Sequence, residues 1–370
     1  MAEPAPADAP RIELRHLYKI FGPREAALFE AVRAGMGKDE LLARHGHVLG
    51  LSDVSLSIAP GRIQVVMGLS GSGKSTLIRH INRLIDPTAG EVVVGDTEVT
   101  GLSATGLRHF RRSATAMVFQ RFGLMPHRSV LDNVAYGLAV QRMPRDDRHR
   151  RADRWIARVG LSGYEDRFPS QLSGGMQQRV GLARALANDA PVLLMDEAFS
   201  ALDPMIRVDM QTMLLDLQQE IGKTIVFITH DLDEALRLGD RIAILKDGVI
   251  VQNGTPEEIV LTPADAYVAS FVREVNRGRV IRLGRVSRPV NGSREGMLPM
   301  PASLCLEDAA ARLTRAGAGT ALALDAAGAA MGWATLGDVV AAMVDRPPAA
   351  GEPQGGDASQ SRSGPASRPV

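Results

Sequence analysis

The chain has 370 residues, 45% hydrophobic and 23% charged, which is the composition of a globular protein of about two domains. Its net charge of +1 and aromatic content of 4% argue against a nucleic-acid partner, which needs basic patches and stacking side chains. The single cysteine, Cys305, excludes an internal disulfide and favours a reducing compartment, and no signal peptide or membrane-spanning run is predicted.

The N-terminal part of the chain predicts two strands separated by a helical insertion. Apolar and polar residues alternate over residues 11–19 and again over 54–58, as in half-buried strands. Between them, apolar residues in 23–50 recur at helical spacing, with a second short helix expected over 38–44. We therefore expect an insertion over residues 23–50.

The next stretch carries a phosphate-binding pattern. An apolar strand over residues 63–67 leads into Gly68, four further residues, Gly73-Lys74-Ser75 and then a helical pattern. Gly71 and Gly73 allow backbone N–H groups to close on phosphates, Lys74 can reach the β- and γ-phosphates, and Ser75 can ligate Mg²⁺. The alternative is a Gly/Ser turn that happens to carry a lysine. The expected phosphate-binding residues are Gly68, Ser70, Gly71, Ser72, Gly73, Lys74, Ser75 and Thr76.

Strands and helices then alternate along the chain, which predicts a parallel sheet with crossover helices. We expect strands over 92–94, 116–119, 191–195 and 224–228, a hairpin over 242–251, and helices over 151–159, 177–186 and 206–217. Ligands of such sheets gather at the carboxyl ends of the strands. Four polar residues stand at those ends: Lys74, Gln120, Asp196 and His230.

Two carboxylates follow the aliphatic strand that ends at Met195. Asp196 can hold Mg²⁺ through water, and Glu197 can orient and deprotonate an attacking water molecule. Acidic residues after a strand are also common helix caps, which is the alternative reading of this pair.

A second anion-binding pattern stands at the start of the 177–186 helix, in the run Leu172-Ser173-Gly174-Gly175-Met176-Gln177. A plain helix cap with a glycine-rich turn is the alternative. The run resembles the signature of ATP-binding cassette (ABC) ATPases. That resemblance implies a homodimer in which the signature of one subunit, with Asp203 in the 200–203 loop, covers the ATP held by the other.

The same resemblance extends over residues 11–262 and implies a P-loop NTPase fold of the α/β class. It assigns Gln120 to contact with Mg²⁺ and His230 to contact with the γ-phosphate, beside Lys74 and Glu197 as catalytic residues. Phe21 takes the place of the aromatic residue that stacks on adenine, with Tyr18 as its competitor. The implied ligands are ATP and Mg²⁺.

Several segments resemble one branch of this family, the ATPase subunits of glycine betaine/L-proline importers. They are residues 17–22, the insertion, and residues 82–85, 125–127, 130–134, 195–204 and 231–235. The branch implies a peripheral subunit on the cytoplasmic face of the inner membrane, docked to permease subunits near 122–133 and served by a solute-binding protein. An importer of another solute and a soluble ABC ATPase are the alternatives, although the coiled-coil heptads or second cassette typical of soluble members are absent from the sequence.

The composition changes beyond residue 262. We expect a flexible N-terminus over 1–10, a cassette over 11–262, a linker helix within 263–280, an α+β module over 281–345 and a disordered tail over 346–370. The sequence of the module predicts a helix over 306–314, a hairpin over 321–334 and a helix over 337–343. In this order of elements the module resembles a single CBS domain. In that family Thr335 and Asp338 would meet a ribose, but the same pair also suits a helix cap. A mainly regulatory protein, whose module binds a nucleotide, is a further alternative.

Overall fold

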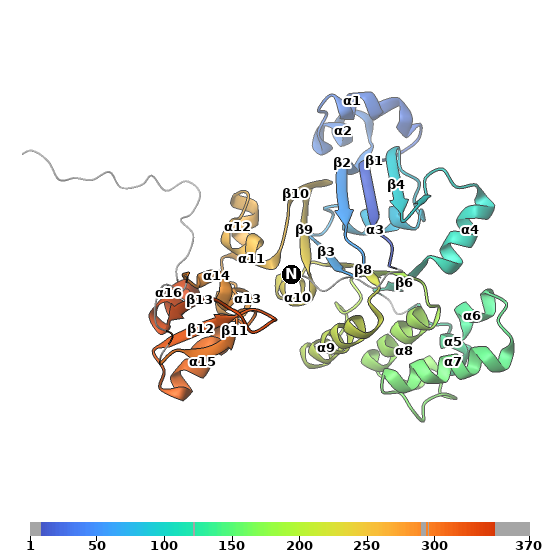
Figure 1. Ribbon diagram of the computed structural model, residues 1–370. Coiled ribbons are helices and arrows are strands. Elements are labelled where there is room, and N and C mark those ends of the chain that lie inside the picture. The colour runs from blue at the N-terminus through green and yellow to red at the C-terminus, as the bar shows by residue number, and fades with distance from the viewer. Residues whose placement is uncertain (1–8, 121–122, 290–293, 295, 345–370) are drawn as a thin grey trace, which may run out of the picture.

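The structure, a computed structural model, describes residues 9–120, 123–289, 294 and 296–344 (Figure 1). Within these ranges the chain forms sheets of six, four and three strands. No helix among them is long and apolar enough to cross a bilayer. The expected tail over 346–370 and all but the end of the N-terminal segment lie outside the described residues.

The six-stranded sheet is the centre of the fold, in the order β10-β9-β3-β8-β7-β6. Five strands are parallel, and β10 pairs with its neighbour β9 in the antiparallel direction. The strands are β3 (Ile63–Met67), β6 (Thr115–Phe119), β7 (Val192–Asp196), β8 (Thr224–Thr229), β9 (Arg241–Lys246) and β10 (Val249–Gly254). Every residue of β3, β7 and β8 is buried, as expected for continuous apolar runs covered on both faces. The predicted parallel α/β sheet is confirmed.

The two faces of this sheet pack against different layers. Val65 and Met67 join a core with helices α8 (Gly174–Ala187), α9 (Pro204–Ile221) and α10 (Leu232–Leu238). Their neighbour Val66 points the other way, into a core shared with α3 (Lys74–Ile81) and the four-stranded sheet. The alternation of side chains along a strand thus places the sheet between two hydrophobic cores.

The four-stranded antiparallel sheet has the order β2-β1-β4-β5. Its strands are β1 (Ile12–Phe21), β2 (Val48–Ile58), β4 (Ala89–Val94) and β5 (Thr97–Glu98). The segment between β1 and β2 holds η1 (Glu25–Leu28), α1 (Phe29–Arg33) and α2 (Lys38–His45). The insertion is therefore helical as expected, but residues 48–50 belong to β2, in which Val48 pairs with Phe21 and Leu49 with Ile20 of β1.

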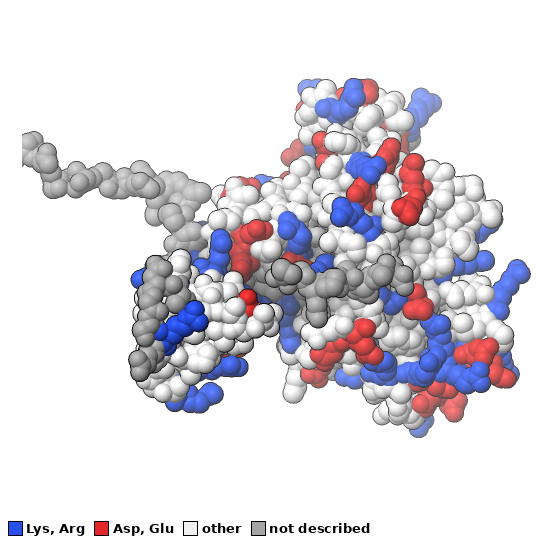
Figure 2. Space-filling view, viewed as in Figure 1, with Lys and Arg blue, Asp and Glu red and all other residues white. Residues whose placement is uncertain are grey.

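A helical arm lies beside the six-stranded sheet at the right of Figure 1. It comprises α4 (Ala104–Ser113), α5 (Val130–Val134), α6 (Tyr136–Val140), α7 (Arg145–Arg158) and η2 (Pro169–Gln171). Helices α5, α6 and α7 share a hydrophobic core with α8. Figure 2 shows charged side chains of both signs over this region, as expected for the solvated face of the Arg- and Asp-rich α7.

The link from the sheet to the C-terminal module differs from the sequence prediction. Instead of one linker helix within 263–280, the structure has α12 (Ala266–Val272) and α13 (Arg277–Val280), after α11 (Pro256–Leu261). Asn276 explains the break, since its backbone is extended and its side chain accepts a hydrogen bond from the Gly278 N–H. This arrangement ends one helix and starts another.

The C-terminal module has its own core, built around residues such as Met300, Leu306 and Val339. Its sheet has the order β11-β12-β13, flanked by three helices. The elements are α14 (Leu283–Val286), β11 (Leu298–Pro301), α15 (Leu306–Ala316), β12 (Thr320–Leu324), β13 (Ala330–Thr335) and α16 (Leu336–Val344). The expected helix–hairpin–helix order is present, and β11 is an additional strand that the sequence did not predict.

Candidate active site

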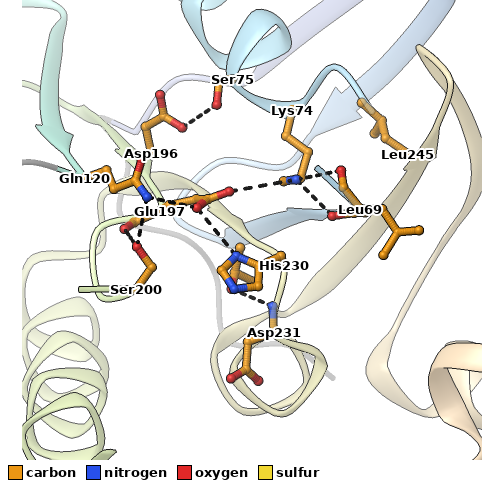
Figure 3. A network of polar contacts seen from close by, with 12 residues as sticks. Leu69, Lys74, Ser75, Gln120, Asp196, Glu197, Ser200, His230, Asp231 and Leu245 are labelled. Carbon is orange, nitrogen blue, oxygen red and sulfur yellow. Dashed lines mark hydrogen bonds and ion pairs between the residues drawn. The ribbon is translucent and has the colours of Figure 1, made fainter. Parts of the chain in front are cut away.

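Four parallel strands end at the same edge of the central sheet. Their register pairs Met67 with Thr229, Ile228 with Asp196, and Asp196 with Phe119. The residues that follow these strands therefore meet in space, as Figure 3 shows. The structure brings together Lys74, Ser75, Gln120, Asp196, Glu197 and His230.

The loop after β3 is shaped for an anion. Gly73 caps α3 in the left-handed region at φ 106°, and a Cβ atom there would lie 2.4 Å from the Gly50 carbonyl oxygen. The Ser72 hydroxyl is buried and has no hydrogen-bond partner within the described residues. A helix N-terminus beside an unsatisfied hydroxyl provides donors for a phosphate. Of the other expected loop residues, Ser70 is exposed and Thr76 lies half-buried in the first turn of α3.

Lys74 folds back over this loop. Its Nζ donates to the carbonyl oxygens of Gly68 at 2.8 Å and Leu69 at 3.0 Å. The side chain is only 5% exposed, and this burial lowers the pKa of Lys74, while the carboxylates of Glu197 and Asp196 oppose the shift. A buried ammonium whose nearest anion is 3.8 Å away, at Glu197 Oε1, would be further stabilised by a phosphate in the loop.

The residues expected around Mg²⁺ offer oxygen ligands. The Ser75 hydroxyl donates to Asp196 Oδ1 at 2.8 Å, and the other oxygen of Asp196 lies 3.2 Å from Arg79 Nη2. No group of three His, Cys, Asp or Glu side chains in the described ranges could hold a metal alone. Hydroxyl, carboxylate and amide oxygens nevertheless fit Mg²⁺, which keeps several waters and shares its ligands with substrate phosphates. The residues present therefore fit the ion.

Glu197 stands at the centre of the polar cluster. Its backbone has φ 47°, an uncommon conformation for a residue with a side chain, and its N–H donates to the Ile228 carbonyl at 3.1 Å. Its Oε2 accepts from Gln120 Nε2 at 3.3 Å and lies 3.5 Å from His230 Nδ1. The carboxylate is thus held between groups from three different strand ends, which suits a general base.

The signature residues lie at the start of α8, a helix of fourteen residues. Ser173 caps it by accepting from the Met176 N–H at 3.3 Å, and Gln177 donates to the carbonyls of Leu172 and Pro169. A Cβ atom on Gly175 would lie 2.6 Å from Ile206 of α9, so only glycine fits here without a shift. Gly174 is the first residue of the helix, and Asp203 caps the neighbouring α9. These bonds are local and do not join the signature to the phosphate loop of the same chain.

The two candidate adenine-stacking residues differ in exposure. Phe21 is 37% exposed, with Lys19 Nζ at 5.2 Å from its ring centroid. Tyr18 is buried and packs edge-to-face against Phe29 of the insertion. Of the two, Phe21 has the ring face that a base could cover.

The sequence reasoning missed two residues of the cluster. Arg79 pairs with Asp196, and the Ser200 hydroxyl accepts from Gln120 Nε2 at 3.3 Å. Arg79 could have been found, since it lies four residues after Ser75 and therefore on the same face of α3. Ser200 had no such signal, because the contact joins residues that are eighty positions apart in the chain.

Comparisons with known proteins agree with this geometry. The family model described as "ABC transporter" matches residues 51–200. The glycine betaine transport ATP-binding protein of Bacillus subtilis (strain 168) is 51% identical over 278 residues, which cover 75% of this chain and 66% of that protein. The trimethylamine N-oxide transport system ATP-binding protein of Ruegeria pomeroyi is 49% identical over 280 residues, covering 76% and 82%.

Solved structures show the same fold. A dimeric ATP-binding cassette in a post-hydrolysis state, bound to ADP and Pi, is 34% identical to this chain and superimposes with a TM-score of 0.57. The match covers 66% of this chain and 98% of the cassette.

Proposed function

The chain belongs to the glycine betaine importer ATPases of the ABC transporter family, and on that premise we propose that it energises import of glycine betaine, proline betaine or a related quaternary amine. The observation that carries this proposal is the cluster at the strand ends. There a buried lysine, two carboxylates, an amide and a histidine meet beside an anion-binding loop (Figure 3).

The residues of this cluster divide the work of hydrolysis. Lys74 and the N–H groups of the loop bind and orient the phosphates of ATP, and Phe21 stacks on its adenine. Ser75, Asp196 and Gln120 would hold Mg²⁺, which would supply neutralisation of the charge on the phosphates. Glu197 takes a proton from the water that attacks the γ-phosphorus as the bond to the ADP oxygen breaks. His230 lies 3.5 Å from the Glu197 carboxylate and would hold either that carboxylate or the γ-phosphate.

A second copy of the chain completes the site. Within the described residues the hydrogen bonds of Ser173 and Gln177 are local. Together with Leu172, Gly174 and Gly175, these residues would cover ATP held by another subunit. Asp203 would cross the same interface. The solved cassette described above is a dimer, which supports this arrangement.

The remaining partners follow from import. Permease subunits would dock on the arm near residues 123–133, and the neighbouring Phe122 lies outside the described residues. A solute-binding protein would deliver the solute to the permease. The chain would then work as a peripheral subunit at the cytoplasmic face of the inner membrane, with no nucleic acid involved.

We further propose the division into domains: a cassette over 11–262, a linker over 263–280 and a single CBS-like module over 281–345. A separate hydrophobic core and a separate sheet within the described part of the module support the last boundary. Its elements follow the helix–hairpin–helix order on which the CBS resemblance rests.

Solute uptake tests the proposal. The chain would be expressed together with the permease and the binding protein encoded by neighbouring genes, in cells that lack betaine import. Uptake of labelled glycine betaine would then be followed after an osmotic upshift. We expect uptake that requires Lys74, so Lys74→Ala should abolish it. Competition by unlabelled proline betaine and trimethylamine N-oxide would rank the solutes. If uptake is absent while the purified chain hydrolyses ATP, the cassette stands and the quaternary amine assignment is wrong.

A further inference from the structure

The insertion between β1 and β2 is packed firmly onto the antiparallel sheet. Leu41 of α2 and Val32 of α1 are buried against Tyr18 and Ile20 of β1 and Leu49 of β2. These contacts fix α2 above the sheet, and with it the first residue of the helix, Lys38.

Lys38 reaches the phosphate loop. Its Nζ donates to the Gly71 carbonyl oxygen at 3.2 Å and lies 3.4 Å from Asp247 Oδ1, in the turn between β9 and β10. The side chains of Lys38 and Asp247 are 33% and 61% exposed, respectively. An ion pair so open to water contributes little to stability, so Lys38 can exchange this partner at small cost.

The other end of the insertion borders the exposed aromatic ring. His47 lies over Gly22, and its ring nitrogens contact the carbonyl oxygens of Pro23 at 2.8 Å and His45 at 2.7 Å. The ring of Phe21 packs against Gly50, where a Cβ atom would lie 2.6 Å from it. The insertion therefore touches the proposed nucleotide site both at the adenine side and at the phosphate loop.

We infer that Lys38 is a second lysine for the phosphates of the nucleotide, supplied by the insertion. The inference rests on the proposed ATP site. Phosphates seated in the loop carry several negative charges and lie beside the Gly71 backbone that Lys38 already contacts. When the nucleotide binds, the Lys38 ammonium, on its flexible side chain, leaves the single exposed carboxylate of Asp247 and contacts these phosphates instead. Because Lys38 contacts Gly71 and Asp247 and shares no contact with Glu197 in the described part of the chain, it contributes to binding and not to proton transfer.

Equilibrium binding of ATP and of ADP to the purified full-length chain tests this assignment. Lys38→Ala removes one charge-assisted contact, so its affinities for ATP and for ADP should each be about tenfold lower than those of the wild type. The dependence of affinity on salt should also be weaker. Lys38→Arg should retain most of the affinity. Asp247→Asn, which removes the competing carboxylate, should bind ATP as tightly as the wild type or more tightly. The turnover number at saturating ATP should stay within about twofold of wild type in Asp247→Asn.

Arg44→Ala is the matched control, since it removes one positive charge from the same helix, where Arg44 pairs with the exposed Glu40. Unchanged affinity in Lys38→Ala, or an equal loss in Arg44→Ala, would overturn the inference. Thermal melting of each variant identifies loss of fold. If Lys38→Ala loses affinity and Lys38→Arg loses it equally, that result would also count against a charge contact. A wild-type chain that fails to bind ATP would instead refute the proposed function, on which the inference depends.

Discussion

Two clusters of polar residues at strand–helix junctions, one in the cassette and one in the C-terminal module, have very different hydrogen bonding. In the cassette, the Ser72 hydroxyl is buried without a partner in the described residues, and Glu197 is shared among groups at 3.3–3.8 Å. In the module, Asp338 accepts from the Thr335 N–H at 3.0 Å and from its hydroxyl at 2.7 Å, and it also binds Arg288.

The difference shows what distinguishes a ligand-ready site from a structural cap. The Thr335 hydroxyl also accepts from the Asp338 N–H at 3.0 Å, so each residue satisfies the other as in a capping box. Donors that are already satisfied gain little from a ligand, whereas a buried unsatisfied hydroxyl and a buried lysine that donates to two carbonyls and has its nearest carboxylate 3.8 Å away gain much. The cassette cluster is therefore the one built for a charged substrate.

The largest effect is expected from Lys74→Ala. It removes the buried ammonium of the phosphate loop, so ATP binding and turnover should both fall by at least about 100-fold. Thermal stability should fall much less than ATP binding does, because burial already makes the charged form of Lys74 unfavourable in the folded protein. Calorimetry measures ATP binding and a phosphate-release assay measures turnover. Lys246→Ala, which removes the same charge elsewhere, is the control. Turnover close to wild type would remove the main support for the site.

A strong effect is also expected from Gly175→Ala. The new methyl group would meet Ile206, shift the start of α8 and displace the signature. Overpacking of this kind costs about 1–3 kcal/mol of folding free energy, and ATP turnover should fall further than stability does. The double variant Gly175→Ala/Ile206→Ala, which removes the Cγ2 and Cδ1 atoms that the new methyl group would meet, should recover turnover in part. A double variant no better than the single one would show that the glycine matters for another reason.

An intermediate, pH-dependent effect is expected at the insertion. Hydrogen bonds to the Pro23 and His45 carbonyls raise the pKa of His47 above its ordinary value of 6.5, because both ring nitrogens must carry protons to donate to two carbonyls. A raised folded-state pKa means that the stabilisation is complete below the unfolded pKa and is lost as pH rises through the folded pKa. The protection of residues 24–47 against hydrogen exchange, measured as the exchange rate relative to the intrinsic rate at each pH, should therefore fall as the pH rises, and His47→Gln should remove that fall. Equal pH dependence in the variant would contradict this role.

The smallest effect is expected from Asp338→Asn in the module. The substitution keeps the Thr335 cap and replaces the charged acceptor of the capping box by a neutral one, which should cost at most about 1 kcal/mol of folding free energy. The Thr335 hydrogen bonds, with help from Arg288, hold the pKa of Asp338 below its ordinary value, so its stabilisation is present at neutral pH and is lost as pH falls through the lowered pKa. Denaturant unfolding of the wild type and the variant at neutral and acid pH measures the loss of stability and its dependence on pH. ATP turnover should stay unchanged, and a loss of turnover would mean that the cluster communicates with the cassette.

Much of the cassette could be predicted from sequence because its signals are local. The phosphate loop has fixed spacing, and the aliphatic runs of β7 and β8 indicate buried parallel strands. Elements that depend on distant contacts or fine local geometry could not be predicted. β11 contains Pro299 and Pro301 and forms only because it lies beside β12, and the contact of Lys38 with Asp247 joins residues 209 positions apart. The break at Asn276 rests on one side-chain hydrogen bond that apolar periodicity does not reveal.

We propose that Glu197, held among Lys74, Gln120 and His230, is the catalytic base of an ATPase. ATP binding and single-turnover hydrolysis by Glu197→Gln test it most directly, with Asp338→Asn measured in parallel. We expect Glu197→Gln to bind ATP as the wild type does and to lose at least about 100-fold in hydrolysis, while Asp338→Asn retains both. Hydrolysis by Glu197→Gln at the wild-type rate, with binding intact, would contradict the assignment.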